Sequence, residues 1–455
     1  MRMKMKNVDM VNGPLFVSIW RFTVPFMLTG LLQIFYNAAD VMVVGRYAGQ
    51  EALAGVGTTG SLSTLILNFI IGLSVGVSVT LGQALGAKDY DGAEKIVHTA
   101  MVLCFLGGAV VSAVGIIFAR PLLSLIDVPE DVMPQAKIYM QIIFAGKIPA
   151  LVYNFGSAVL RAKGDTKRPL YIVTVSGIIN VVLNMFFVIK LGMKADGVGL
   201  ATVISQVFTA VAILYCLRTE EGHTRLYFKK IRLYKKEALR IVKIGLPSGV
   251  QSMVFSLANV IIQSGVNSFG SSATIAGNSA ATRGGGFYSV ALNSLSQTTV
   301  AFVSSNTGAK RFDRVRKIVR YSMIDVAIVW AAEVLVTLLF AKHLVGLYVP
   351  GNEAALQIGV SRHMIIGCSY GLCGIMEVAS GAIRGMGKSF LTMMVAIAGV
   401  CGIRIVWVLF IFPLIGTYPS LVISMPLSWI VTSLLQYAMY LYVFQKEKKA
   451  EMVSV

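Results

Sequence analysis

Long apolar runs alternate with short polar segments along the whole chain. A membrane-spanning helix needs about 20 predominantly apolar residues to cross a hydrocarbon core about 30 Å thick, and twelve runs reach that length with few charges. They lack the period of two that barrel strands show and are too long for such strands, so helices must satisfy the backbone in lipid. The predicted spans cover residues 16–39, 53–80, 95–119, 136–159, 169–190, 196–217, 244–268, 276–303, 319–341, 359–383, 390–413 and 419–444. The pattern predicts an all-α polytopic membrane protein with twelve transmembrane helices.

The chain also repeats itself. Residues 25–101 recur without a gap at 247–323, at a constant offset of 222. Further on the offset is 223, where residues 157–164 recur at 380–387, so one residue is inserted between the two blocks. A period of this length is too long for a solenoid unit and is typical of a duplicated multi-helix lobe.

Six predicted spans fall in each half, which predicts two pseudo-symmetric six-helix lobes. Because six is an even number, both halves enter the membrane from the same side, and an axis along the membrane normal relates them. We expect an N-terminal lobe at residues 1–217, a cytoplasmic connecting loop at 218–243 and a C-terminal lobe at 244–455.

The charges are few and unevenly placed. Charged residues make up 13% of the chain and hydrophobic residues 56%, whereas soluble domains carry about 25% charged residues. Of the 40 Lys and Arg residues, 30 fall on one face of the predicted topology, and the positive-inside rule makes that face, with both termini, cytoplasmic. The net charge of +19 comes from short loops beside the membrane. We therefore expect contact with membrane lipids and no nucleic-acid partner.

No constellation for covalent or metal chemistry is visible. The five cysteines lie within or at the end of predicted spans and fit small packing residues. The four histidines come without an HExxH pattern or a close cluster of acidic residues, so a metal-ligand set is missing. The chain is therefore expected not to be an enzyme and to need no cofactor.

Polar residues inside the first-half spans are the candidates for function. Asp40 lies near the end of the first span with Asn37 one turn before it, and Asn180 and Asn184 share one face of the fifth span. Thr202 lies in the sixth span. An intramembrane carboxylate is costly and is by default a functional hypothesis; the alternative is a helix-end Asp that reaches the outer headgroups. Each amide or hydroxyl alone equally fits a polar residue that joins helices, but together with Asp40 they predict one polar pocket.

The second half differs from the first at this point. Ile262 stands where the repeat would place Asp40, so the predicted cation site is one-sided. Glu377 in the tenth span lies deepest beside small residues and is the best acidic candidate there. Arg283 and Arg404 lie in the eighth and eleventh spans, where an ion pair or a water-filled cavity is required because a lipid-facing Arg is very unfavourable.

Several short motifs occur in a fixed order and in duplicate. They are Pro25 in the first span, the helix end Asn37-Ala38-Ala39-Asp40, the paired loops Gly86-Ala87-Lys88 and Gly308-Ala309-Lys310, and the paired segments 160–165 and 383–388. In their order, spacing and duplication, the chain resembles the MATE family, the multidrug and toxic compound extrusion transporters, over about residues 12–445.

The resemblance implies two lobes that form a V-shaped central cavity. It also implies a secondary active multidrug efflux transporter that exchanges cationic or aromatic compounds for H⁺ or Na⁺ by alternating access. The family's first-span Asp falls on Asp40, its fifth-span Asn on Asn180 and its sixth-span Thr on Thr202. The family's second acid falls on Asn184, so one carboxylate stands where relatives have two. If sodium is the coupling ion, these four residues are its expected ligands.

A mechanism follows from a lone acid in an apolar lobe. Desolvation disfavours the charged form of Asp40, so we expect a proton or a sodium ion there to remove an uncompensated charge and to favour one access state. Tyr36, Tyr139, Asn154 and Glu377 are expected to line the substrate cavity, where stacking or cation–π attraction would hold a flat cationic ligand.

The resemblance further implies small amphipathic cations as substrates, a monomer, and the inner membrane of a bacterial cell. A flippase for a lipid-linked precursor is the nearest alternative, since related proteins share the plan of helical lobes; such a protein would need a strongly cationic cavity for pyrophosphate. A membrane-embedded enzyme is a further alternative, and it would need the nucleophile or metal set that the sequence lacks.

Overall fold

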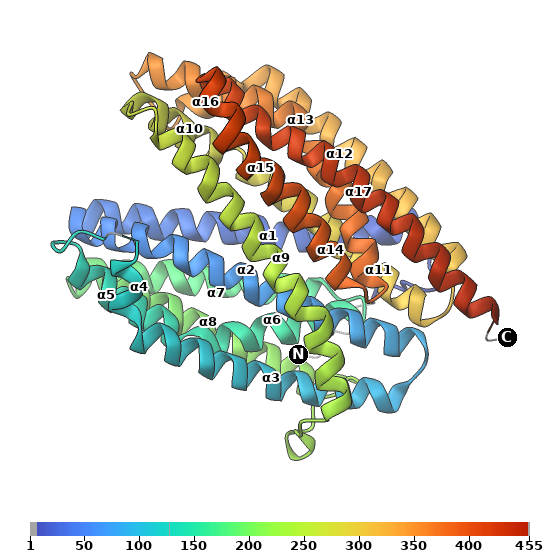
Figure 1. The fold of residues 1–455 in the computed structure, drawn as a ribbon. Coiled ribbons are helices and arrows are strands. Elements are labelled where there is room, and N and C mark those ends of the chain that lie inside the picture. The colour runs from blue at the N-terminus through green and yellow to red at the C-terminus, as the bar shows by residue number, and fades with distance from the viewer. Residues whose placement is uncertain (1–6, 127, 454–455) are drawn as a thin grey trace. The chain divides into compact units, whose positions relative to one another are not determined.

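The computed structural model describes residues 7–126 and 128–453, except the side chains of Gln50, Ser61 and Val453, as helices joined by short loops without strands (Figure 1). The helices of the first half are α1 (Leu15–Tyr47), α2 (Gln50–Gly86), α3 (Tyr90–Ile117), α4 (Ala119–Ser124), α5 (Met133–Ala145), α6 (Lys147–Ala162), α7 (Lys167–Met185), the π-helical turn η1 (Phe186–Lys190) and α8 (Ala195–Arg218). The 3₁₀ turn η2 (Phe228–Lys230) leads into the second half. Its helices are α9 (Lys235–Asn267), α10 (Ser272–Gly284), α11 (Gly286–Gly308), α12 (Phe312–Gly346), α13 (Glu353–Gly385), α14 (Ser389–Ala396), the π-helical turn η3 (Ile397–Gly402), α15 (Ile403–Val406), the π-helical turn η4 (Trp407–Ile411), α16 (Phe412–Ile415) and α17 (Tyr418–Val453).

The helices account for the predicted spans. Within the described part of the chain, 10 helices are long and apolar enough to cross a membrane, and α5 with α6 makes an eleventh, bent by 43°. The predicted span 276–303 falls on α10 and α11, which meet at Gly285 and are rich in Ser, Thr, Asn and Gly. Each of the twelve predicted spans lies on one helix or on consecutive helices.

Two compact units divide the chain at equivalent positions of the repeat. Unit 1 comprises Met1–Asp9 and Val24–Gly245, and unit 2 comprises Met10–Thr23 and Leu246–Val455. Val24 and Leu246 correspond at the offset of 222, and each precedes a proline inside its helix, Pro25 in α1 and Pro247 in α9. Proline removes a backbone hydrogen bond from a helix. Each of α1 and α9 therefore passes from one unit to the other at the point where its backbone hydrogen bonding is interrupted.

Equivalent contacts hold the N-terminal part of α9 in unit 1 and the N-terminal part of α1 in unit 2. In unit 1, Gly76 of α2 faces Gly245 of α9 so closely that a Cβ atom at Gly76 would lie 2.2 Å from the carbonyl oxygen of Ile241. In unit 2 the equivalent residues are Thr298 of α11 and Thr23 of α1, whose hydroxyl groups hydrogen bond at 2.9 Å. Small residues let helices approach closely in lipid, so glycine makes in one unit the contact that a hydroxyl pair makes in the other.

Gly76→Ala is expected to destabilise the protein, because the added methyl group would meet backbone atoms rather than a flexible side chain. Overpacking of this kind costs about 1–3 kcal/mol. Gly57→Ala on the same helix is the matched control, since a Cβ atom there meets nothing within 4 Å and Ala is favoured over Gly in a helix by about 0.5–1 kcal/mol. Thermal unfolding of the purified variants in detergent measures both effects, and equal melting temperatures would contradict the close packing.

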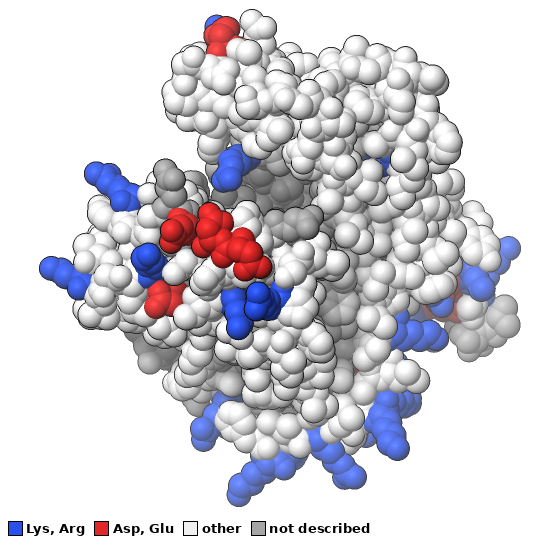
Figure 2. Space-filling view, turned by 60° about the vertical axis from the view of Figure 1, so that its left-hand side comes forward, with Lys and Arg blue, Asp and Glu red and all other residues white. Residues whose placement is uncertain are grey.

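Apolar side chains cover the outer faces of the long helices. On α3, Leu106, Val110 and Ile117 are 55%, 62% and 70% exposed. Figure 2 shows broad areas of the surface without acidic or basic side chains. Exposed apolar surface of this extent marks contact with a membrane, in agreement with a multi-pass membrane protein.

Candidate functional site

Asp40 meets the polar face of α7. The residue lies in the last third of α1, and Asn184 of α7 donates a hydrogen bond from Nδ2 to its carboxylate. Asn184 is completely buried, so this contact is shielded from solvent. Because the acceptor is a carboxylate, the hydrogen bond is stronger than one between neutral groups.

The polar contacts continue along α7 and reach α8. Asn184 and Asn180 lie one turn apart, with Nδ2 of Asn184 3.3 Å from Oδ1 of Asn180. Nδ2 of Asn180 donates to Oγ1 of Thr202 on α8 at 3.5 Å. The structure therefore brings Asp40, Asn184, Asn180 and Thr202 into one hydrogen-bonded series across three helices.

This series offers oxygen atoms to a small cation. Asp40 supplies a carboxylate, Asn180 and Asn184 supply amide oxygens, and Thr202 supplies a hydroxyl. Among the described residues, Oδ1 of Asn184 is buried without a hydrogen-bond partner, and a bound cation would satisfy such an acceptor. Hard cations prefer oxygen ligands of these kinds, and Asp40 by itself is a site for a proton. No group of three or more His, Cys, Asp and Glu suited to a metal occurs in residues 7–126 and 128–453.

Both tyrosines predicted for the substrate cavity lie against helix backbone in unit 1. Tyr36 donates to the carbonyl oxygen of Thr174 at 3.1 Å, and its ring covers Gly177 of α7, where a Cβ atom would collide with it. Tyr139 of α5 lies beside Gly199 of α8, with a ring carbon 3.4 Å from the position of a Cβ atom there. Both rings therefore lie against the helices that carry the polar series.

Asn37 and Asn154 take no part in the polar series. Asn37 is exposed one turn before Asp40. Nδ2 of Asn154 donates to the carbonyl oxygen of Ala150 in its own helix, α6, at 2.8 Å. Asn37 remains a prediction for the cation site, and Asn154 remains a prediction for the substrate cavity.

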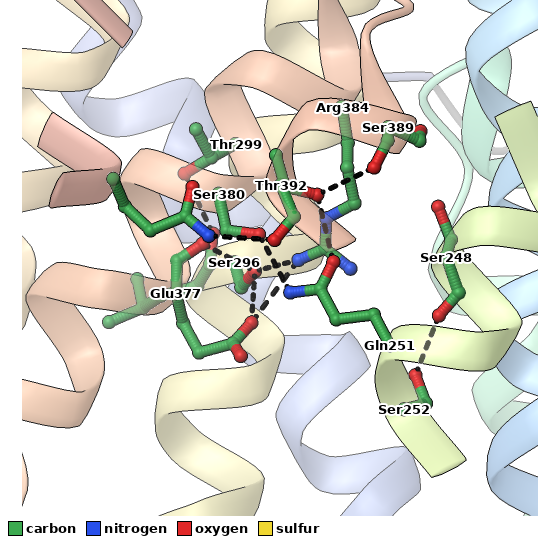
Figure 3. Close-up of polar contacts among 12 residues, drawn as sticks. Ser248, Gln251, Ser252, Ser296, Thr299, Glu377, Ser380, Arg384, Ser389 and Thr392 are labelled. Carbon is green, nitrogen blue, oxygen red and sulfur yellow. Dashed lines mark hydrogen bonds and ion pairs between the residues drawn. The ribbon is translucent and has the colours of Figure 1, made fainter. Parts of the chain in front are cut away.

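Glu377 belongs to a polar network inside unit 2 (Figure 3). Arg384 follows it by two turns on α13, and Nη2 of Arg384 lies 3.2 Å from Oε2 of Glu377. Ser296 of α11 donates to the same carboxylate oxygen at 3.1 Å and accepts a hydrogen bond from Arg384 at 3.0 Å. The side chains of Glu377 and Arg384 are 19% and 6% exposed, so they form a largely buried ion pair.

Neutral side chains extend this network to three further helices. Gln251 of α9 donates to Oγ of Ser380 at 3.1 Å and accepts from Oγ1 of Thr392 on α14 at 2.8 Å. Gln436 of α17 donates to the carbonyl oxygen of Thr392 at 3.0 Å. The pairing of Glu377 with Arg384 is not among the sequence predictions, although their separation of seven residues, two helical turns, is a signal for such a contact.

Arg404 is buried without an acidic partner. It is 1% exposed and lies in α15, between two π-helical turns. The residue donates to Oδ1 of Asn259 at 3.0 Å and to Oγ of Ser428 at 3.1 Å, and the ion pairs of the described residues do not include it. Neutral acceptors therefore take the place of an ion pair, which is one of the two environments expected for Arg404. Arg283, the other predicted deep arginine, is exposed on α10.

The first-half copy of the paired segment carries an ion cluster. Glu220 contacts Lys163 at 2.7 Å and Arg168 at 2.6 Å, and Arg168 also pairs with Asp165. Burial tends to raise the pKa of Glu220, but the hydrogen bonds and charges of Lys163 and Arg168 outweigh this effect and hold the pKa below its usual value. The cluster joins the end of α6 to the start of α7 and the loop after α8, which gives this motif a structural role.

Comparisons with known proteins extend over both units. The family model MatE matches residues 25–186 and 247–410. The chain is 29% identical to the probable multidrug resistance protein YoeA of Bacillus subtilis (strain 168), over 96% of each chain. It is 23% identical to the FAD transporter of Shewanella oneidensis, again over 96% of each chain. Among solved structures, it shares the fold of a MOP superfamily transporter from Pyrococcus furiosus, with a TM-score of 0.91, 21% identity and coverage of 98% of this chain and 99% of that chain.

Proposed function

Because this chain belongs to the MatE family of transporters, we propose that it is a secondary active efflux transporter that exchanges cationic or aromatic compounds for protons or sodium ions by alternating access. A probable multidrug resistance protein and an FAD transporter are among its relatives, which supports a small organic molecule as the cargo. Membership of a transporter family also agrees with the expectation that the chain is not an enzyme and needs no cofactor.

The observation that carries the proposal is the contact of Asp40 with Asn184. It places a carboxylate of α1 against a buried amide of α7, and the series extends through Asn180 to Thr202 of α8. An ionisable side chain inside a membrane bundle is expensive and is found where ions or substrates pass. The series therefore supports an ion-coupling site in the first half of the chain.

The coupling step follows from neutralisation of Asp40. A proton on the carboxylate removes the charge that strengthens the hydrogen bond from Asn184. A sodium ion would instead draw the oxygen atoms of Asn180, Asn184 and Thr202 toward itself. Either event changes the contact between α1 and α7, and the ion can drive transport only if it binds the two access states with different affinity.

The proposed setting is the inner membrane of a bacterial cell, with the protein as a monomer and both termini in the cytoplasm. The bias of basic residues toward one face of the predicted topology supports this orientation, and the Bacillus and Shewanella relatives support a bacterial membrane. We propose amphipathic cations as substrates, with Tyr36, Tyr139, Asn154 and Glu377 among their contacts.

Efflux of ethidium from proteoliposomes tests this function. The purified protein is reconstituted, and an inward proton gradient, an inward sodium gradient or neither is imposed. We expect efflux that follows one of the two gradients and stops when nigericin or monensin collapses it; protein-free liposomes give the background. Efflux no faster than that of protein-free liposomes under either gradient would contradict the proposal. Movement of a fluorescent lipid-linked precursor between leaflets in the same vesicles would favour the flippase.

A further inference from the structure

Unit 2 contains a cavity of about 380 Å³, a size typical of small-molecule sites. Residues of α9, α10, α11, α13 and α17 line it, and they include Tyr288, Tyr370, Arg362 and His363. Among the described residues in its wall, none is acidic. The ionisable side chains of the wall are therefore aromatic or basic, which distinguishes it from the site around Asp40 in unit 1.

The cavity occupies the place in its repeat that the Asp40 site occupies in the other. Three of its lining residues are the repeat equivalents of residues in or beside that site. The equivalents are Ile262 for Asp40, Met425 for Thr202 and Arg362 for Tyr139. Compared with the first half, the second half has no carboxylate at this place and has a guanidinium group instead. The charge of its site is therefore opposite to that of the Asp40 site.

The packing supports this correspondence. In unit 1 a Cβ atom at Gly55 would lie 2.9 Å from the backbone nitrogen of Ala136, one turn before Tyr139. In unit 2 a Cβ atom at Gly277 would lie 3.0 Å from the backbone nitrogen of Gly359, one turn before Arg362. Both pairs make the same close contact, so α5 and the start of α13 are structural equivalents at the offset of 223.

Arg362 is the key residue of the cavity. The residue is 8% exposed, and its Nη1 has no hydrogen-bond partner in the part of the chain that the structure describes. Its other contacts are weak acceptors for a cation, Sδ of Met425 at 3.8 Å and the hydroxyl group of Tyr418. A buried charge without a counter-ion is strongly unfavourable, and an anionic ligand in the cavity would supply the missing partner.

Further donors and positive charge surround the same space. Oδ1 of Asn259 accepts from Arg404 at 3.0 Å, which leaves Nδ2 of this lining residue as a donor. Arg404 also repels Arg362 electrostatically, and the ring of His363 lies 3.3 Å from the hydroxyl group of Tyr288. Glu333 of α12 interacts with Tyr288 and Tyr370 but does not line the cavity.

We propose that this cavity binds the anionic group, a carboxylate or a phosphate, of a small aromatic molecule. Arg362 contacts the anion, Asn259 donates a hydrogen bond to it, and the rings of Tyr288 and Tyr370 hold the aromatic part by stacking. The site is separate from the proposed ion-coupling site, and it extends the proposed cargo beyond cations.

Binding of three probes with the same ring tests the proposal. The full chain in phosphatidylcholine nanodiscs is titrated by calorimetry with 1-naphthyl phosphate, 1-naphthol and 1-naphthylmethylammonium, with empty nanodiscs subtracted. We expect the phosphate to bind most tightly, and Arg362→Gln to weaken it by about tenfold or more because a charge-assisted contact is lost. Lys342→Gln, which removes an exposed charge of α12, is the matched control and should bind like the wild type.

Each other outcome has a defined meaning. Tightest binding of the ammonium probe, or unchanged phosphate binding by Arg362→Gln, would overturn the proposal; the ranking of the probes by the wild type suffices if that variant fails to fold. If phosphatidylglycerol in the nanodiscs abolishes phosphate binding, a lipid headgroup occupies the cavity and the proposal of a small aromatic ligand is wrong. The three probes are ranked without an ion gradient, so the result does not depend on the proposed ion coupling.

Discussion

Asp40→Asn is expected to reduce gradient-driven ethidium efflux to the level of protein-free liposomes while the protein stays folded. The substitution keeps the shape of the side chain and its place beside Asn184, but it removes the only group of the polar series that can bind a proton or bring a negative charge to a sodium ion. Without a differential interaction between ion and protein, the gradient cannot shift the equilibrium between access states. Substrate binding in the absence of a gradient should persist.

Asp91→Asn is the matched control for this substitution. Asp91 pairs with Lys95 within α3, and its side chain is 79% exposed. Exposed ion pairs contribute little to stability, so this variant should transport like the wild type. If Asp40→Asn retained efflux with unchanged dependence on the gradient, Asp40 would not be the coupling residue and the polar series would have a structural role only.

The series around Asp40 could be predicted because its parts follow local rules. Asn180 and Asn184 share a helical face through their separation of four residues. A carboxylate in an apolar span is costly, which makes Asp40 a functional candidate. Thr202 is a polar residue in an apolar span, and the family resemblance assigns it to the cation site; the family match confirms that resemblance. The hydrogen-bond order, from Asn184 to Asp40 and from Asn180 to Thr202, depends on how three helices pack and could not be derived from spacing.

Contacts between residues far apart in sequence account for most of the structural features that the sequence did not predict. Trp20 at the start of α1 donates to Asp325 of α12 at 2.9 Å, and the first turns of α1 belong to unit 2. No periodicity within residues 16–39 reveals this, because an apolar helix face fits lipid and protein alike. The repeat did contain a clue, since Thr23 and Thr298 correspond to Gly245 and Gly76, which touch in unit 1.

Glu377 shows how an isolated sequence signal changes its meaning in three dimensions. As an acid in an apolar span it is a candidate for the substrate cavity, and that remains a prediction. The hydrogen bond that Glu377 accepts from Ser296 and its ion pair with Arg384 give it a second role, to neutralise a buried arginine. In the first half, Asn154 stands in the place of Glu377 and Arg161 stands in the place of Arg384. The first half therefore keeps the arginine without the acid.

Glu377→Leu is expected to destabilise the protein by roughly 3–5 kcal/mol, because it leaves the buried guanidinium of Arg384 without its counter-ion. Glu377→Leu/Arg384→Met should recover at least half of the loss, since an apolar pair of similar volume needs no counter-ion. Asn154→Leu is the matched control: within the described part of the chain its amide bonds only to the Ala150 carbonyl oxygen, so its loss should cost about 1 kcal/mol. Thermal and denaturant unfolding in detergent measure the stability of all three variants.

A Glu377→Leu protein with wild-type stability but without ethidium efflux would contradict this structural role. Such a result would place the carboxylate of Glu377 in contact with the substrate, and the ion pair with Arg384 would then be a contact of the resting protein that the cargo replaces.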